Sequence, residues 1–580
     1  MTSWVSDNVR GSVRPASGRT AGAAPAHGGY GLAVIGAGPA GLAAAVTAAD
    51  SGLRVVLIDA SERPGGQYFR QAAPGLAPRS RPVHHQRGAF AAWSARLAAH
   101  ARGGRITHLP RRHVWMVEED GPADHRLWTL RHVPVDGGPV DGGPVDGGPV
   151  SGAPVDDVSV DGTPVDGTPI AAATAGGTPA AGAPAGGVRV TRARCLLLAT
   201  GAYERQLPFP GWTLPGVVAA GGAQAILKDS RALPGRRIVV AGSGPLLLAV
   251  AVSLAEAGAD IPVLVEAASY IGYADRLGVL ARNPAKAVEG ARLAADLLRY
   301  RIRPRTRSAV VRAHGRDRVE AVTLATLDRD WRPVAGTEVR VACDALAVGH
   351  GLVPQLELAV ALGCALRTAP DGTPAVAVDD QQRTDVPGLW AAGESTGIGG
   401  VGLALLEGRS AALSVADRLQ AGGRTARLRG TTARLRGTTA RLRGTTARLR
   451  GTTARQRRFA DLMAAVHRPG VHWPQWLTQD TDVCRCEEVT AHVLWQAHEL
   501  GAHDMRSAKL LTRAGMGWCQ GRMCETAVAC LAAGGDGSAP LVPARRPLSC
   551  PVSLKDLAQS APAAGPDDLD PATTPGPPAA

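Results

Sequence analysis

Four cysteines near the end of the chain have the type and spacing that most directly predict chemistry. Cys484 and Cys486 form a C-x-C pair, and Cys519 and Cys524 form a C-x4-C pair after 32 intervening residues. Four thiolates can bind zinc or a [2Fe–2S] cluster. The C-x-C pair is short for structural zinc, whereas C-x4-C matches the loop spacing of plant-type ferredoxins. The spacing therefore favours [2Fe–2S] over zinc or plain buried thiols.

Glycines surround the second pair, in the sequence GMGWCQGRMC. Gly515, Gly517 and Gly521 allow backbone N–H groups to turn toward the sulfurs and stabilise a negatively charged cluster. The other cysteines have no ligand spacing, and we expect them to be core residues or bystanders: Cys195, Cys343, Cys364, Cys530 and Cys550.

A dinucleotide-binding fingerprint lies near the start of the chain, in YGLAVIGAGPAGLAAAVTAADSGLRVVLIDA. An apolar strand, a glycine-rich turn, an Ala-rich helix and a second strand follow one another in the required order. The first glycine permits the turn, the second lets the backbone approach a pyrophosphate, and the third lets helix and strand pack closely. An acid after the second strand can accept hydrogen bonds from a ribose. The predicted site residues are Gly36, Gly38, Pro39, Ala40, Gly41 and Asp59.

A second, incomplete fingerprint begins at Gly235, in GRRIVVAGSGPLLLAVAVSLAEAGADIPVLVEAA. Gly242 and Gly244 fit the pattern, but Leu247 occupies the third glycine position. Glu266 stands where a ribose-binding acid would favour NAD over NADP. Two interpretations follow: a working NAD(P) site, or an inherited domain that binds another nucleotide or none. The incomplete pattern favours the second.

Three further motifs add to the first fingerprint: SERPGGQYFR, LLLATGAYERQLPFPGW and TDVPGLWAAGESTGIGG. With them the chain resembles the glutathione-reductase-like flavin oxidoreductases, which have an α/β fold with two dinucleotide-binding domains. The resemblance implies FAD, although no cysteine pair lies near the flavin motifs. Glu394 replaces the usual aspartate, so its bond to the ribityl chain is less assured. The implied FAD contacts are Gly65, Gly66, Gln67, Ala199, Thr200, Gly201, Gly393 and Glu394.

The cysteine-rich stretch resembles the small, α-rich [2Fe–2S] domain of the bacterioferritin-associated-ferredoxin type. The whole arrangement resembles the alpha-type FAD subunits of heteromeric opine oxidases, hydrogen cyanide synthase and hydroxyproline or proline dehydrogenases. That resemblance implies a partner flavoprotein, similar to amino-acid oxidases, which binds the substrate and oxidises the C–N bond of an amino or imino acid. This chain would then pass electrons, through FAD and the cluster in an open order, to an unidentified acceptor. Catalytic residues stay unassigned, because Glu204, Arg205 and His350 can equally hold structure.

Two other functions are compatible with the same motifs. One is a stand-alone NAD(P)H-dependent flavin and iron–sulfur oxidoreductase, and the other is a non-enzymatic scaffold protein with degenerate cofactor sites. Anaerobic mixing with NADH separates the electron-transferring subunit from the stand-alone enzyme, because only the second should show rapid flavin bleaching.

The basic net charge does not predict nucleic-acid binding. The formal charge is +14, but residues 424–458 contain 12 Arg and no acid, so the rest of the chain carries 14 − 12 = +2. We therefore expect no specific nucleic-acid partner. The sequence shows no signal peptide or membrane-spanning stretch, and its nine cysteines are an odd number. We expect a cytoplasmic protein, with membrane association through the acceptor left open.

Two repeats interrupt the expected domains. A Pro- and Gly-rich period of five fills residues 133–187 and predicts an expanded hairpin loop, and four copies of ARLRGTT predict a basic, flexible or frayed-helical linker. The predicted organisation is a disordered N-terminus (1–28), an FAD-binding domain (29–132, 188–228 and 346–422), the loop insertion (133–187), a second nucleotide-binding-like domain (229–345), the linker (423–458), the [2Fe–2S] domain (459–535) and a disordered tail (536–580).

Overall fold

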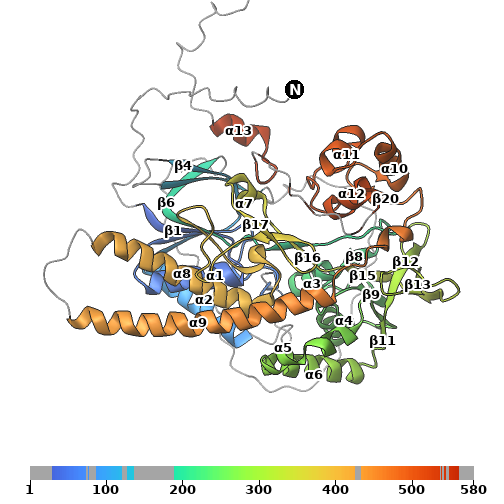
Figure 1. The fold of residues 1–580 in the computed structure, drawn as a ribbon, viewed down its shortest axis with the longest axis horizontal. Coiled ribbons are helices and arrows are strands. Elements are labelled where there is room, and N and C mark those ends of the chain that lie inside the picture. Colours follow the sequence, from blue (N-terminus) through green and yellow to red (C-terminus); the bar gives the residue numbers. More distant parts are fainter. Residues whose placement is uncertain are drawn as a thin grey trace, which may run out of the picture.

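The computed structural model describes residues 29–73, 76, 87–120, 127–135, 188–424, 433–535, 537, 541, 543, 546 and 548–560. The predictions for residues 1–28 and for most of 133–187 lie outside these ranges. The described elements form two α/β units with a smaller helical unit beside them (Figure 1). The predicted α/β class is confirmed.

The first unit is a seven-stranded sheet in the order β3-β2-β1-β6-β5-β4, with β19 paired to β6. Strands β1, β2, β3 and β6 run parallel, and β1 and β2 consist of apolar residues that are buried along most of their length. Such continuous apolar runs are typical of central strands covered on both faces. The elements are β1 (Tyr30–Ile35), α1 (Pro39–Asp50), β2 (Val55–Ile58), α2 (Arg87–Arg102), β3 (Ile106–Leu109), β4 (Arg112–Asp120), β5 (Leu127–Pro134), β6 (Arg189–Leu198), β19 (Leu389–Ala391) and α8 (Gly400–Arg424).

The second unit is a five-stranded parallel sheet in the order β11-β10-β9-β15-β8. An antiparallel sheet of three strands packs beside it, through β12. The elements are β8 (Val217–Ala219), α3 (Ala220–Asp229), β9 (Ile238–Gly242), α4 (Leu246–Glu256), β10 (Leu264–Glu266), η2 (Tyr270–Arg276), α5 (Leu277–Ala281), α6 (Pro284–Arg299), β11 (Pro304–Thr306), β12 (Ser308–His314), β13 (Ala321–Thr326), β14 (Val339–Ala342) and β15 (Ala345–Gly349).

Short elements join the two sheets and carry the flavin motifs. They are β7 (Ala202–Glu204), β16 (Leu352–Pro354), α7 (Glu357–Ala361), β17 (Leu366–Thr368), β18 (Pro374–Val376) and η3 (Gly393–Thr396). The helical unit consists of η4 (Trp473–Trp476), β20 (Asp482–Cys484), β21 (Val489–Thr490), α10 (Ala491–Glu499), α11 (Met505–Thr512) and α12 (Glu525–Ala532).

The strands on either side of the five-residue repeat are neighbours. β5 and β6 pair antiparallel, with Trp128 opposite Ala193 and Arg131 opposite Val190. The predicted hairpin arrangement of the flanking strands is therefore confirmed, while residues 136–187 between them lie outside the described part of the chain.

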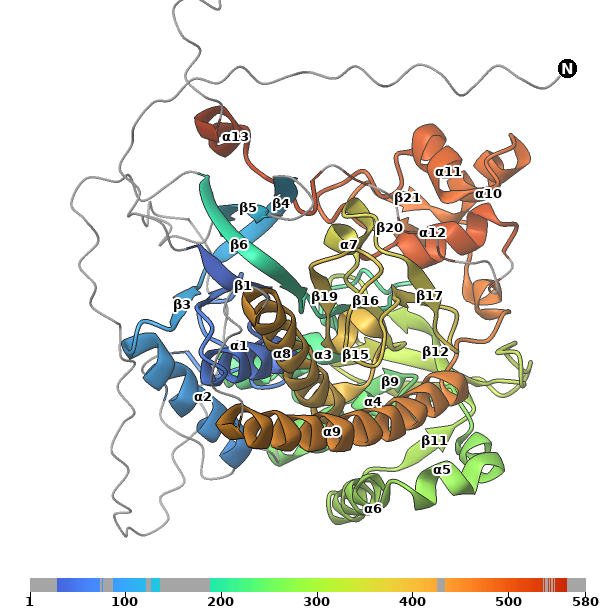
Figure 2. The ribbon, with the colours of Figure 1, turned by 60° about the vertical axis from the view of Figure 1, so that its left-hand side comes forward.

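The seven-residue repeat differs from the expected flexible linker. Residues Ala433–Val466 form one continuous helix, α9, of 34 residues. It contacts α8, α5 and η2, so it extends past both α/β units (Figure 2). Gly and Thr disfavour a helix by up to about 1 kcal/mol each, but Ala, Leu and Arg favour one, and tertiary packing outweighs the difference. Leu449 and Thr453 are accordingly buried.

The C-terminal tail also differs from the expected disorder where it is described. The Ser549 N–H donates to the carbonyl of Trp115 at 2.9 Å, and Cys550 packs against Trp115 and Val133. A short helix, α13 (Leu554–Ser560), follows above β4 (Figure 1). The edge strand supplies partners that the local sequence of a Pro-rich segment cannot reveal.

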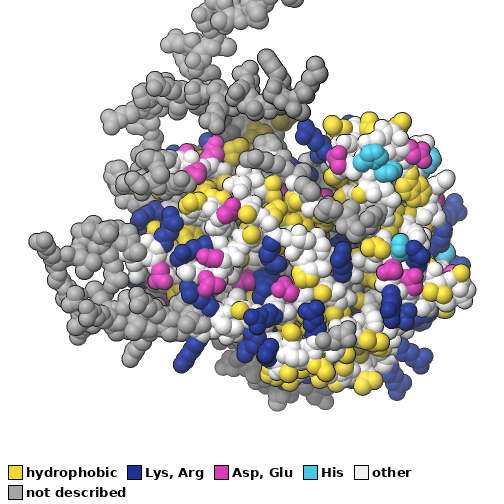
Figure 3. Space-filling model, in the orientation of Figure 1, with side chains coloured by type: hydrophobic (Ala, Val, Ile, Leu, Met, Phe, Trp, Pro, Cys, Tyr) yellow, Lys and Arg dark blue, Asp and Glu magenta, His cyan; other side chains and the backbone are white. Residues whose placement is uncertain are grey.

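Charged side chains are mixed on the face drawn in Figure 3. Lys and Arg alternate there with Asp, Glu and hydrophobic groups. Among the described helices, none has the length and apolar character needed to cross a membrane.

Candidate functional site: the flavin motifs and four paired thiols

The first glycine loop has three glycines in three different environments. A Cβ on Gly36 would lie 2.2 Å from the carbonyl oxygen of Ala199, and one on Gly41 would lie 1.8 Å from that of Gly36. Gly38 instead faces open space, with no heavy atom within 4 Å of an added Cβ. Gly36 and Gly41 are needed for packing, whereas Gly38, just before Pro39 at the start of α1, is open on the side that the predicted approach of a pyrophosphate requires.

Asp59 is placed at the end of β2 beside this loop. Its buried carboxylate accepts hydrogen bonds from the N–H groups of Ala37 and Ser61. These bonds fix the carboxylate and leave other lone pairs for a ligand, because an ionised carboxylate has about four acceptor sites. The position fits the predicted ribose contact.

The Gly65-Gly66 turn closes on the same loop. The Gly65 N–H donates to the carbonyl of Ala37 at 2.8 Å, and a Cβ on Gly66 would lie 2.9 Å from the Cα of Gly38. Gln67 follows, and its carbonyl accepts from the Nζ of Lys228 at 3.3 Å. Burial lowers the pKa of Lys228 to about 8. The structure therefore brings this motif to the dinucleotide loop.

Ala199, Thr200 and Gly201 follow β6 next to the end of β1. The Ala199 N–H donates to the carbonyl of Ile35 at 2.9 Å, and the Thr200 hydroxyl donates to the carbonyl of Gln355 at 2.9 Å. Motifs that are far apart in sequence thus meet at the carboxyl ends of neighbouring strands, which is where open α/β sheets bind ligands.

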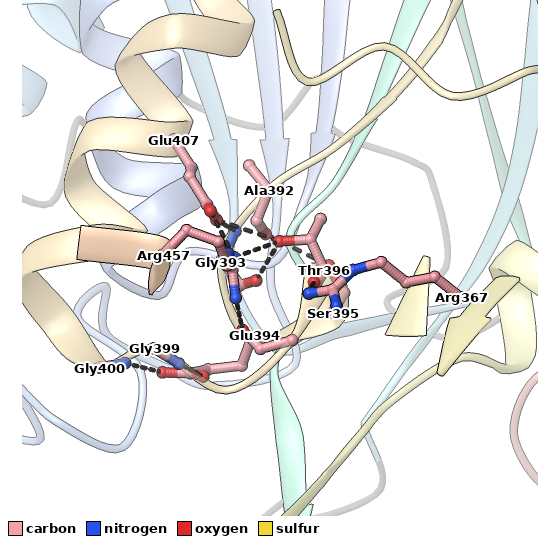
Figure 4. Close-up of polar contacts among 11 residues, drawn as sticks. Arg367, Ala392, Gly393, Glu394, Ser395, Thr396, Gly399, Gly400, Glu407 and Arg457 are labelled. Carbon is pink, nitrogen blue, oxygen red and sulfur yellow. Dashed lines mark hydrogen bonds and ion pairs between the residues drawn. The ribbon is translucent and has the colours of Figure 1, made fainter. Parts of the chain in front are cut away.

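Gly393 and Glu394 form the turn between β19 and α8 (Figure 4). A Cβ on Gly393 would lie 2.8 Å from the Cβ of Ala40, so this turn touches the start of α1. The Glu394 carboxylate accepts from the N–H groups of Gly399 and Gly400 at 2.8 and 2.9 Å, and burial raises its pKa. The extra methylene of Glu thus reaches the start of α8, while the predicted contact with a ribityl chain stays a prediction.

A buried ion pair behind this turn was not predicted from the sequence. Glu407 on α8 accepts from the Gly393 N–H at 2.9 Å and pairs with Arg457 on α9. Arg457 also donates to the Gly397 carbonyl at 2.7 Å and to the Thr396 hydroxyl at 2.9 Å. Figure 4 shows both side chains converging on the turn. Arg457 lies in the segment we expected to be a linker, among many arginines that no local pattern distinguishes.

The acid that follows the second dinucleotide loop is engaged by the chain itself, although Gly244 of the loop faces open space, as Gly38 does. Glu266, 1% exposed, accepts from the N–H groups of Gly244 at 3.0 Å and Ala268 at 2.9 Å. His467 lies just after α9, and its Nδ1 is 3.5 Å from the Glu266 carboxylate. The Nε2 of His467 lies 3.0 Å from the hydroxyl of Tyr273. The acid at the ribose-binding position of the second fingerprint therefore has internal partners.

The third position of that loop is accommodated without a glycine. Leu247 is buried at 2% exposure in the core of the second unit, against residues of β9 and β15. Helix α4 begins at Leu246, one residue before it. The Leu247 side chain therefore fills space between α4 and the sheet, where a glycine would let the helix and the strand pack more closely.

The four predicted ligand cysteines meet in two pairs. The thiols of Cys484 and Cys524 share a hydrogen bond, which lowers the pKa of Cys484 to about 6 and raises that of Cys524. The thiols of Cys486 and Cys519 also share a hydrogen bond. Each pair thus combines one cysteine from each sequence motif.

Among the three predicted glycines, Gly515 directs its N–H at a sulfur, and Gly517 allows the two cysteine loops to approach closely. The Gly515 N–H donates to the sulfur of Cys484 at 3.4 Å. A Cβ on Gly517 would lie 2.5 Å from the Cβ of Cys486, so the two loops approach as closely as only glycine permits. Backbone N–H groups directed at sulfur stabilise thiolates.

The four thiols have the number that a [2Fe–2S] cluster requires, but the residues that the structure describes show no metal site. In the described part of the chain, no group of three or more His, Cys, Asp or Glu side chains has the arrangement to hold a metal ion. A [2Fe–2S] cluster needs two thiolates on each of two irons, which two pairs can supply. The cluster itself stays a prediction.

Comparison with known proteins agrees with the flavin motifs. Residues 31–130 match the family "FAD dependent oxidoreductase", and residues 176–416 match "Pyridine nucleotide-disulphide oxidoreductase". The chain is 30% identical to an opine oxidase subunit of Rhizobium meliloti, over 86% of this chain and 81% of the relative. The chain belongs to this family of FAD-dependent oxidoreductase subunits.

Two other similarities support the family assignment and the fold. The hydrogen cyanide synthase subunit HcnB of Pseudomonas protegens is 33% identical, over 57% of this chain and 67% of the relative. The L-proline dehydrogenase structure from P. horikoshii aligns with a TM-score of 0.58 at 17% identity, over 91% of this chain and 79% of that chain. The last similarity concerns the fold alone.

Two of the three unassigned polar residues of this oxidoreductase chain, Glu204 and Arg205, have structural partners, whereas the Nδ1 of His350 is buried without a hydrogen-bond partner. Glu204 accepts from the N–H groups of Gly221 and Gly222, at the start of α3. Arg205, 3% exposed, pairs with Asp371 at 2.7 Å. His350 is buried, and burial lowers its pKa to about 3. These contacts support leaving the catalytic residues unassigned.

Proposed function

We propose that this chain is the electron-transferring subunit of a heteromeric dehydrogenase or oxidase that acts on the C–N bond of an amino or imino acid. The observation that carries the proposal is the meeting of four thiols in two pairs in a protein whose family binds FAD. FAD, when bound, exchanges two electrons, whereas a [2Fe–2S] cluster exchanges one at a time.

The flavin-binding residues have distinct tasks in this proposal. The open side of Gly38 admits the pyrophosphate at the start of α1, and Asp59 accepts hydrogen bonds from the ribose. The Gly65-Gly66, Ala199–Gly201 and Gly393-Glu394 turns surround the remaining part of the cofactor. Glu407 and Arg457 hold the last of these turns in place.

The proposed partner is a second flavoprotein, similar to amino-acid oxidases, that binds the substrate. Two relatives are named as subunits, of opine oxidase and of hydrogen cyanide synthase. A division of labour also agrees with the structural partners of Glu204 and Arg205, which leave no assigned acid or base in the described flavin motifs. Coexpression with the adjacent reading frame, followed by co-purification and amino-acid or opine oxidation with an artificial acceptor, tests this part.

The internal contacts of Glu266 argue against NADH as the electron source. The Glu266 carboxylate is engaged by backbone N–H groups and by His467, so a ribose would have to displace internal contacts. Anaerobic mixing of the FAD-loaded chain with NADH should leave the flavin absorbance unchanged. Rapid bleaching would instead support a stand-alone NADH-dependent oxidoreductase.

Metal analysis tests the proposed cluster. Iron-replete, anaerobic purification should give about two irons and two acid-labile sulfides per chain, with the absorbance of [2Fe–2S]. Cys519→Ser should remove that absorbance, while the matched variant Cys530→Ser, at a buried cysteine outside the two pairs, should keep it. Zinc in place of iron, or a colourless protein, would contradict the proposal and favour zinc or a scaffold.

A further inference from the structure

Arg522 lies inside the C-x4-C motif, but its side chain leaves the cysteine loop and reaches the first α/β unit. Its Nε lies 2.8 Å from the hydroxyl of Tyr203 and 2.8 Å from a carboxylate oxygen of Glu357. Tyr203 in turn donates to Glu357 at 2.7 Å. The three side chains form a closed triangle in which the arginine charge is paired.

The other end of the guanidinium binds two carbonyls. One Nη donates to the carbonyl of Ser549 at 2.6 Å, and the other to that of Cys519 at 3.3 Å. Ser549 is itself attached to β4, since its hydroxyl donates to the carbonyl of Val114 at 2.9 Å. Arg522 thus joins the cysteine loop, the C-terminal tail and the short elements β7 and α7.

The residues that Arg522 contacts are directly connected to a flavin motif. Tyr203 lies on β7, two residues after Gly201, and pairs with Val353 of β16. The next residues carry Gln355, whose carbonyl accepts from Thr200, and Glu357 at the start of α7. Tyr203 and Glu357 are thus tied to the Ala199–Gly201 turn, and Arg522 is part of the cysteine loop. If the contacts of Arg522 with Tyr203 and Glu357 are lost, the thiols can therefore move relative to the Ala199–Gly201 turn.

We propose that Arg522 is a positioning residue that holds the Cys519–Cys524 loop at a fixed distance from the FAD site, so that electrons can pass between them within one chain. The inference rests on the proposed function. When bound, FAD and a [2Fe–2S] cluster would supply a balanced one-electron exchange, and Arg522 would fix the positions of the segments that hold them. Arginine suits this task because its planar group satisfies several acceptors at once, which a lysine ammonium cannot do in the same geometry.

The test compares Arg522→Gln with Arg513→Gln. Arg513 lies in the same unit and also forms an ion pair, with Glu487 at 3.0 Å, but its side chain is 71% exposed. After a flash that reduces the flavin, the electron redistribution to the cluster is followed by flavin absorbance and by the electron paramagnetic resonance of the cluster. Loss of the fixed geometry should slow redistribution at least ~10-fold in Arg522→Gln, with unchanged FAD and iron contents, and should leave Arg513→Gln as wild type.

A second readout does not need the cluster. Hydrogen exchange at residues 519–524 and at the Ser549 N–H should become faster in Arg522→Gln and not in Arg513→Gln. Tyr203→Phe, a milder change, should have a smaller effect, and the double variant should be no worse than Arg522→Gln alone, because both residues act in one contact. Arg522→Lys should restore the exchange rates only in part.

Equal redistribution and equal exchange in Arg522→Gln and Arg513→Gln would overturn the inference. If Arg522→Gln does not fold, Tyr203→Phe decides in its place, and unchanged rates there would also overturn it. A wild-type protein without iron would refute the proposed function, whereas the exchange measurements would still decide whether Arg522 holds the loop.

Discussion

Replacing Arg457 by Leu should weaken the first α/β unit and its hold on FAD. Leucine replaces the apolar stem of the arginine but removes its guanidinium group, which is the partner of Glu407. The Glu407 side chain is 2% exposed. It also removes the donors to the Gly397 carbonyl and the Thr396 hydroxyl. Glu407 would then be left as a buried carboxylate without its cation.

The expected cost is large because one member of a buried pair is removed. Such a change typically destabilises by about 3–5 kcal/mol. The Arg457 side chain is 18% exposed, and Glu407 keeps its bond from the Gly393 N–H, so we expect a loss of about 3 kcal/mol, at the lower end of that range. The matched variant is Arg450→Leu, seven residues earlier on the same helix. Its partner Asp380 is 63% exposed, so about 0–1 kcal/mol should be lost.

Urea denaturation of the FAD-loaded protein, followed by the rise of free-flavin fluorescence, measures the difference. Equilibrium dialysis gives the FAD affinity of each variant. Adding Glu407→Gln to Arg457→Leu should recover part of the loss, since it removes the unpaired charge. Equal midpoints and equal FAD affinities for Arg457→Leu and Arg450→Leu would refute the reasoning.

Two further predictions concern the glycine loop and pH. Gly38→Ala should reduce FAD affinity with little change in the stability of the apoprotein, because its Cβ meets open space; Gly41→Ala should impair folding, since its Cβ would lie 1.8 Å from the carbonyl oxygen of Gly36. Thermal melting of the apoprotein and titration with FAD measure the two effects. A loss of FAD affinity without a loss of apoprotein stability in both variants would contradict the prediction. Burial lowers the pKa of His350 from 6.5 to about 3. The His350 side chain therefore stays neutral in the folded protein, whereas in the unfolded chain it takes up a proton as the pH falls below 6.5. This effect should lower stability by about 2 kcal/mol between pH 7 and 5, and His350→Gln should flatten the pH dependence measured by urea denaturation in that window; parallel curves for variant and wild type would exclude it.

The sequence predicted the local geometry of the first site because each of its motifs is a short, continuous pattern. Gly36 and Gly41 follow from the tight turn and the close helix contact, and both show the expected lack of space. The pairing of β5 with β6 followed from strand-like segments on both sides of a Pro- and Gly-rich insertion. These features depend on residues that are neighbours in sequence or that belong to one strand–turn–helix unit.

The contacts between units could not be predicted in this way. Arg457 stands in a run of similar arginines, and only the position of α8 makes it the partner of Glu407. Arg522 lies among the cysteines but binds Tyr203, which is 319 residues away. Ser549 lies in a Pro-rich tail and is ordered by the edge of β4. A pattern based on composition or period contains no information about such partners.

The position of α9 relates the two dinucleotide loops to each other. Arg457 supports the turn at the first loop, and ten residues later His467 covers the acid of the second. About 15 Å separates these positions along a helix, since each residue adds about 1.5 Å. The contacts named here that fix the helix lie between Leu449, near its middle, and its C-terminal end. Because seven residues are nearly two helical turns, a repeat copy gained or lost before Leu449 would change the length of the helix without moving Arg457 or His467 from their partners. The same helix can thus tolerate a change in repeat number at its N-terminal end while Arg457 stabilises the Gly393-Glu394 turn and His467 contacts Glu266 at its other end.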